Sequence, residues 1–114
     1  MTRYAALIPL LALGACAVVN TAPPPGQVAQ LRDIRDSCLM HNAIRLDDGR
    51  SDAATIGQAV TAACGRENNA LISAIAGPDG FRESDIRRQI LQNSNEAATQ
   101  YVLSHRAARS VRRS

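Results

Sequence analysis

The side chains of this 114-residue chain that could do chemistry are few. They are three cysteines, Cys16, Cys38 and Cys64, and two histidines, His41 and His105. Thiols and imidazoles can bind zinc or serve in nucleophilic catalysis, and thiols can also pair as disulfides. Which chemistry applies depends on the spacing of these residues and on the redox state of the compartment.

The surroundings of Cys16 point to export. Arg3 gives the N-terminus a positive charge, and residues 4–13 form an apolar stretch of the length found in signal peptides. With Pro9 inside it, this stretch is too short to cross a bilayer as a stable helix. The sequence that follows, Leu13-Gly14-Ala15-Cys16, has one apolar and two small residues before the cysteine. This pattern resembles the lipobox of bacterial lipoproteins.

The resemblance implies that the Cys16 thiol receives a diacylglyceryl group, after which cleavage removes residues 1–15. It also implies an envelope location with the membrane as a partner through the lipid. Ala17, where an Asp tends to retain lipoproteins at the inner membrane, favours the outer membrane, facing the periplasm. An alternative stays open, because Ala15-Cys16-Ala17 also fits the A-x-A site of ordinary signal peptidase. Cleavage before Val18 would release a soluble periplasmic or secreted helical protein.

The stretch after Cys16 is expected to be a tether. Residues 17–26 have no amphipathic period and contain Pro23-Pro24-Pro25. Consecutive prolines favour polyproline II, so ten residues would extend roughly 30 Å at ~3.1 Å per residue.

The composition of the rest favours an all-α domain. The chain has no Trp and one Phe, so its core must come from Leu, Ile, Val and Ala, which suits closely approaching helices. We expect three helices between residues 27 and 105: a helical hairpin with a third helix packed across it. The first covers residues 27–47, the second begins with Ser51 as its cap and ends at Gly77-Pro78, and the third runs from about residue 81 to 105.

The polar interruptions of these helices give further expectations. In the third helix, the polar stretch from Gln92 to Glu96 predicts a bend or fraying, and Glu83 and Arg87 form a favourable i,i+4 pair. In the second helix, Glu67 interrupts an otherwise apolar stripe.

Cys38 and Cys64 are predicted to form a disulfide. Both fall on the apolar stripes of consecutive antiparallel helices, at nearly equal distances from the turn between them. The bacterial periplasm oxidises thiols. A bridge that closes about 27 residues would stabilise the fold by roughly 3.5 kcal/mol in the chain-entropy model.

A zinc site and a catalytic site, the alternatives to a structural disulfide, have less support in the sequence. Cys38-x-x-His41 with Cys64 and His105 could be imagined as a zinc site, but a second closely spaced ligand pair is missing. No glycine-rich phosphate loop, G-x-S-x-G or H-E-x-x-H motif occurs. Asp47 and Asp48 lie beside Gly49 in a turn, where acids are ordinary. We therefore expect no catalytic residue, no metal, no cofactor and no enzyme activity.

Charge is concentrated at the C-terminus. Residues 16–104 have a net charge of −2, whereas residues 106–114 carry four arginines and no acid: Arg106, Arg109, Arg112 and Arg113. The excess of basic over acidic residues thus comes from a short tail and does not indicate nucleic-acid binding. These arginines could contact anionic lipid or lipopolysaccharide phosphates or peptidoglycan carboxylates. The alternative is a solvated helix end favoured by its own dipole.

Together these features predict a signal peptide (1–15), a lipidated Cys16 with a Pro-rich tether (16–26), a helical domain (27–105) and an Arg-rich tail (106–114). The expected protein is a non-enzymatic binding or structural lipoprotein of the cell envelope, with an unknown envelope protein or polymer as its partner.

Overall fold

The computed structural model describes residues 26–114, which form four helices and no strand. The helices are α1 (Gln27–Leu46), α2 (Ala53–Ala63), α3 (Gly65–Ala76) and α4 (Glu83–Arg113). The all-α class is confirmed, with one helix more than predicted. The predicted signal peptide, the lipidation site at Cys16 and the tether up to residue 25 lie outside the described residues.

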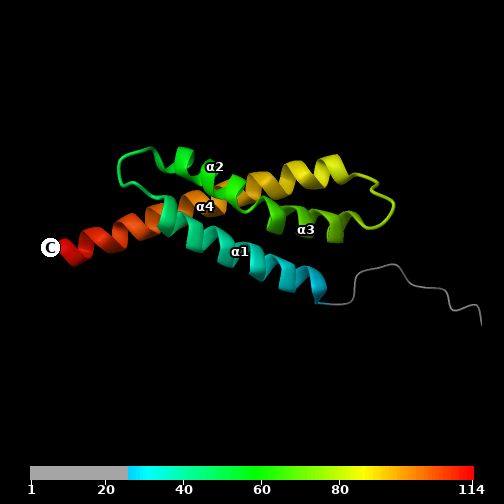
Figure 1. Ribbon diagram of the computed structural model, residues 1–114, viewed down its shortest axis with the longest axis horizontal. Helices are drawn as coiled ribbons and strands as arrows, with labels where there is room; N and C mark the ends of the chain where they lie inside the picture. Colours follow the sequence, from blue (N-terminus) through cyan, green and yellow to red (C-terminus); the bar gives the residue numbers. More distant parts are fainter. Residues whose placement is uncertain (1–25) are drawn as a thin grey trace, which may run out of the picture.

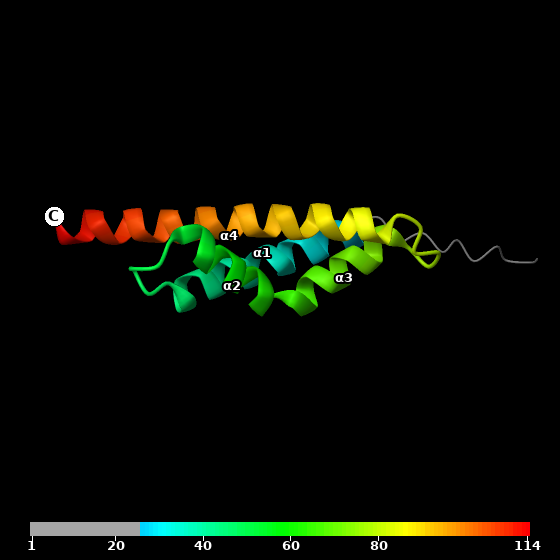
Figure 2. The ribbon, with the colours of Figure 1, turned by 90° about the horizontal axis from the view of Figure 1, so that it is seen from above.

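The helices form an elongated bundle in which α4 is the long member (Figures 1 and 2). Helices α1 and α4 run in the same direction, and α2 and α3 together lead the chain back in the opposite direction. Helix α4 contacts each of the other three. The chain enters α1 at the end of the bundle where the α3–α4 connection lies, and α4 finishes at the opposite end.

The extra helix arises because the predicted second helix is broken at Cys64. The backbone of Cys64 leaves helical geometry, and Gly65 starts α3 in a new direction. Cys64 is also the residue bridged to Cys38 of α1. At the break, the Thr61 carbonyl accepts from the backbone N–H of Cys64 at 3.2 Å, and the side-chain Nδ2 of Asn68 donates to the same carbonyl at 3.3 Å. The disulfide to α1 and the buried Asn68 side chain thus stabilise a bend that helical periodicity does not predict.

The start of α2 also differs from the expectation. Asp52, and not Ser51, is the cap: its carboxylate accepts hydrogen bonds from the backbone N–H groups of Ala54 and Thr55. The Ser51 hydroxyl instead donates to Asp48. The predicted Glu83–Arg87 ion pair is present in the first turn of α4 at 2.9 Å.

The core consists of two apolar clusters built almost entirely from aliphatic side chains, as the composition predicts. The larger cluster contains Leu39, Ala43, Ala53, Ile56, Val60, Cys64, Ala98 and Val102. The smaller cluster contains Leu71, Ile72 and Ile90. The single Phe, Phe81, is 79% exposed in the α3–α4 connection. On α1, Leu39, Asn42 and Ala43 are buried, whereas Ile34 is exposed.

Between the two clusters lies a buried polar pair. Ser94 of α4 donates to the Oδ1 atom of Asn68 of α3 at 2.7 Å, and both residues are fully buried. The pair explains why the polar middle of α4 neither bends nor frays, contrary to the expectation. Ser94 occupies a core position and its hydroxyl has a partner there, so the helix continues without interruption.

Helix α4 also passes the predicted end at residue 105 and continues to Arg113. The Arg-rich segment is therefore the last part of a helix and not a separate tail. Among residues 26–114, no helix combines the length and apolar character needed to span a membrane.

Candidate functional site

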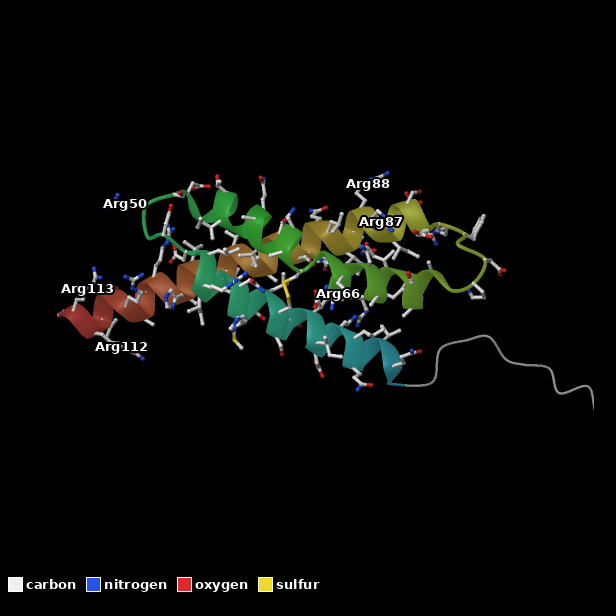
Figure 3. The ribbon with its side chains drawn as sticks, in the orientation of Figure 1. Arg50, Arg66, Arg87, Arg88, Arg112 and Arg113 are labelled. Atoms are coloured by element: carbon white, nitrogen blue, oxygen red, sulfur yellow. A yellow bond between two sulfur atoms is a disulfide. The ribbon has the colours of Figure 1, made fainter. Side chains whose placement is uncertain are left out.

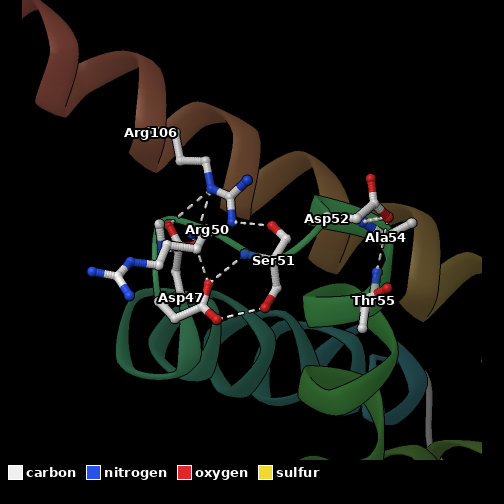
Figure 4. A network of polar contacts seen from close by, with 9 residues as sticks. Asp47, Arg50, Ser51, Asp52, Ala54, Thr55 and Arg106 are labelled. Carbon is white, nitrogen blue, oxygen red and sulfur yellow. Dashed lines mark hydrogen bonds and ion pairs between the residues drawn. The ribbon is translucent and has the colours of Figure 1, made fainter.

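The connection between α1 and α2 is a loop held by its own acidic side chains. Asp47 accepts a hydrogen bond from the backbone N–H of Gly49, and Asp48 accepts from the N–H groups of Arg50 and Ser51 and from the Ser51 hydroxyl. Gly49 takes the positive φ of 69° that this tight turn requires. Figure 4 shows this network beside α4. The loop is thereby fixed where α4 passes it.

Arg106 of α4 joins the helix to this loop. Its Nε and Nη2 atoms donate to Asp47 Oδ1 at 3.0 and 2.6 Å, and Nη2 also donates to the Ser51 carbonyl at 2.8 Å (Figure 4). The Asp47 side chain is fully buried and that of Arg106 is 27% exposed. A planar guanidinium with several fixed donors suits such a multiple contact.

These contacts fix the charge state of the loop. The hydrogen bond from Arg106 lowers the pKa of Asp47 even though burial opposes this shift. The hydrogen bond from the Ser51 hydroxyl, followed by those from the backbone of Arg50 and Ser51, lowers the pKa of Asp48 to about 2. Asp47 in turn raises the pKa of Arg106. At neutral pH both acids are ionised, and their oxygens are already bonded.

Beyond the loop, the last two turns of α4 and the loop border a concavity of about 460 Å³. It is lined by Gly49, Arg106, Arg109, Ser110, Arg113 and Ser114. The Nη1 atom of Arg109 lies 4.0 Å from the position that a Cβ atom on Gly49 would occupy, so the Arg109 guanidinium reaches back over the loop. The wall that α4 contributes contains three arginines, Arg106, Arg109 and Arg113.

The four arginines predicted to contact an anionic surface therefore have different surroundings. Arg106 is bound to Asp47 and serves the fold, which makes it a poor candidate for surface contact. Arg109 and Arg113 line the concavity. Arg112 does not line it, and Figure 3 shows Arg112 and Arg113 pointing to opposite sides of the helix. Within residues 26–114, neither Arg109, Arg112 nor Arg113 has a carboxylate within ion-pair distance.

No protein-family model, curated protein or solved structure matches this chain. Its function must be inferred from its own chemistry.

The predicted disulfide is present. Cys38 and Cys64 are bonded to each other, with 6.0 Å between their Cα atoms (Figure 3). Within the described residues, the one group of three potential metal ligands that lies close together is Cys38, Cys64 and Glu67. Both sulfur atoms are already in the disulfide, so neither can act as a thiolate ligand. His41 is exposed on α1 and is not part of this group.

Two residues that organise the structure were missed by sequence reasoning. The sequence predicts an ordinary turn residue at Asp47, and nothing in it pairs Asp47 with Arg106, 59 positions away. Asn68 was passed over in favour of the neighbouring Glu67, which is only partly buried. A polar residue at a core position becomes recognisable only once its partner, Ser94, is placed opposite it.

Proposed function

We propose that this chain is a lipid-anchored, non-enzymatic module of the bacterial cell envelope, tethered through Cys16, that presents the cationic end of α4 away from its anchor. The observation that carries the proposal is the arrangement of the two ends. The chain enters α1 at one end of the bundle, and α4 ends with Arg112 and Arg113 at the other (Figures 1 and 3). The 31 residues of α4 alone extend about 46 Å at 1.5 Å per residue.

The Cys38–Cys64 disulfide supports an exported location, because such bonds persist in oxidising compartments such as the periplasm and are rare in the cytosol. The lipobox-like Leu13-Gly14-Ala15-Cys16 supports a lipid anchor at the outer membrane, with Ala17 following the cysteine. An anchor of two or three acyl chains would hold the protein durably at the membrane.

The test is the intact mass of the mature protein after expression of the full chain in a Gram-negative host. We expect a membrane-bound product that begins at Cys16 and carries the mass of a diacylglyceryl group. The matched control is Cys16→Ser, which removes the lipid acceptor but keeps the Ala-x-Ala pattern of residues 15–17. This variant should lose the lipid mass and leave the membrane fraction. A wild-type product that begins at Val18 without lipid would refute the proposal and establish the soluble alternative.

A further inference from the structure

We propose that the concavity between Gly49 and the last two turns of α4 binds carboxylate groups of peptidoglycan, the anionic polymer of the cell wall. The location of this ligand rests on the proposed function, whereas the chemistry of the site rests on the structure.

The first argument is an excess of unpaired positive charge. Arg109 and Arg113 line the concavity, and residues 106–114 contain no acidic side chain. The nearest acids in the loop, Asp47 and Asp48, are occupied by Arg106 and by the loop itself. The guanidinium groups of Arg109 and Arg113 are thus free to bind an external anion. Arginine binds carboxylates in a planar, often bidentate geometry.

The second argument is that the site is held in place. The buried positions of α4 recur every four residues, at Ile90, Ser94, Ala98 and Val102. The same four-residue spacing continues to Arg106, which is bound to the loop, and then to Ser110, which lines the concavity. The contact between Arg106 and Asp47 fixes the backbone of α4 at the edge of the concavity, which sets the position from which the exposed side chains of Arg109 and Arg113 extend.

Arg109 and Arg113 are also four residues apart, so they lie on one face of α4, one above the other. Two guanidinium groups one turn apart can hold two carboxylates, or one carboxylate between them. The free carboxylates of peptidoglycan peptides recur along a polymer, so a weak single contact can be repeated by many anchored copies.

An anionic membrane is the less favoured partner. A helix that lies on a membrane inserts a broad apolar face, and Val111 is the one large apolar side chain of residues 106–114. The arginines also lie at the end of the bundle opposite the start of α1. Both observations favour a polymer away from that membrane.

The experiment is co-sedimentation of the Cys16→Ser full chain with purified, insoluble peptidoglycan sacculi at low ionic strength. The double variant R109Q/R113Q is compared with R66Q/R112Q, which removes the same charge from exposed arginines that do not line the concavity. We expect R109Q/R113Q to weaken binding about tenfold or more, the change given by ~1.4 kcal/mol of lost interaction. R66Q/R112Q should bind like the parent protein.

Two further arms identify the anion. Sacculi whose carboxylates have been amidated should no longer bind, and vesicles of phosphatidylglycerol should bind far more weakly than untreated sacculi. Equal losses in the two double variants would show a non-specific charge effect and overturn the site. Preferential binding to vesicles, or binding to amidated sacculi, would overturn the carboxylate ligand. Circular dichroism of each variant verifies that the helices are intact.

The lipid is absent from this experiment, so its outcome is independent of the anchor. If the protein binds sacculi but proves not to be lipidated, the proposed binding site is supported and only the proposed lipid anchor is refuted. If the protein is lipidated but does not bind sacculi, the lipid anchor is supported and the proposed binding site is refuted.

Discussion

Asp47 and Asp48 are adjacent in the sequence, yet they have different partners. Asp47 is buried against Arg106 of α4, whereas Asp48 is exposed and accepts hydrogen bonds from its own loop. Asp47 thus connects two elements distant in the sequence, and Asp48 stabilises one turn. Both contacts require the ionised carboxylate, so they make the folded state sensitive to acid.

The stability of the protein should therefore fall in acid. The folded-state pKa values of both residues lie below the ordinary 3.8, and that of Asp48 is about 2. As the pH decreases from about 4, the unfolded chain takes up protons before these groups do, which favours unfolding. The contribution is fully present above about pH 4 and is lost toward pH 2. Urea unfolding measured across this range should show the decrease.

The variant Arg106→Gln distinguishes the contribution of Asp47 to this acid sensitivity from that of Asp48, because Arg106 is the main cause of the lowered Asp47 pKa. The variant should be less stable at neutral pH and should lose less stability between pH 4 and pH 2. Arg50→Gln is the matched control, since the Arg50 side chain is exposed in the same loop and the network uses only its backbone. An Arg106→Gln profile parallel to that of the parent protein would contradict the assigned role of Arg106.

At the scale of the helices, the sequence predicted what depends on local periodicity. Apolar spacing and turn residues predict the all-α class and the turn at Gly49. They also predict that Cys38 and Cys64 face each other. The break at Cys64 could not be predicted in this way, since the bend depends on the bridge to α1 and on Asn68 binding the Thr61 carbonyl. The sequence predicts the end of the last helix near residue 105, because periodicity does not reveal that Arg106 is bound to Asp47.

A close helix crossing supplies a test at this scale. Gly57 of α2 packs against α4, where a Cβ atom would lie 3.1 Å from the Thr99 backbone nitrogen and 3.2 Å from the Asn95 carbonyl oxygen. Gly57→Ala should therefore destabilise the protein by ~1–3 kcal/mol through overpacking, despite the better helix propensity of alanine. Chemical denaturation measures the change in the free energy of unfolding.

Gly65→Ala provides the matched comparison, because a Cβ atom on Gly65 would meet nothing within 4 Å. Its φ angle is not positive, so alanine fits the backbone there. This variant should be neutral or slightly stabilising. If both substitutions had the same effect on stability, the close crossing at Gly57 would not be a packing constraint.

The whole molecule has a small core for its length. Two aliphatic clusters are separated by the polar pair of Asn68 and Ser94, and no aromatic side chain is fully buried in residues 26–114. A core of this kind provides limited stability, and small exported domains commonly depend on disulfides to supplement it.

Reduction of Cys38–Cys64 should accordingly destabilise the domain by roughly 3.5 kcal/mol, the loop-closure value for a bridge across about 27 residues. The Cys16→Ser chain isolates this bond, because it leaves no other cysteine. Its urea midpoint should fall on addition of reductant, while a C38S/C64S derivative should be insensitive to it. An unchanged midpoint after complete reduction, verified by alkylation and mass, would show that the bridge contributes little.

The position of α4 in the chain has a consequence for the order of folding and anchoring in the export that we propose. This helix comes last, yet it supplies Ala98 and Val102 to one core cluster and Ile90 to the other. If the chain is exported as we propose, the first three helices therefore have no complete core until α4 has followed them. A secretion channel that passes unfolded polypeptide would meet no folded domain to resist it. The lipid proposed for Cys16 would be attached while the domain is still open, so anchoring would precede folding.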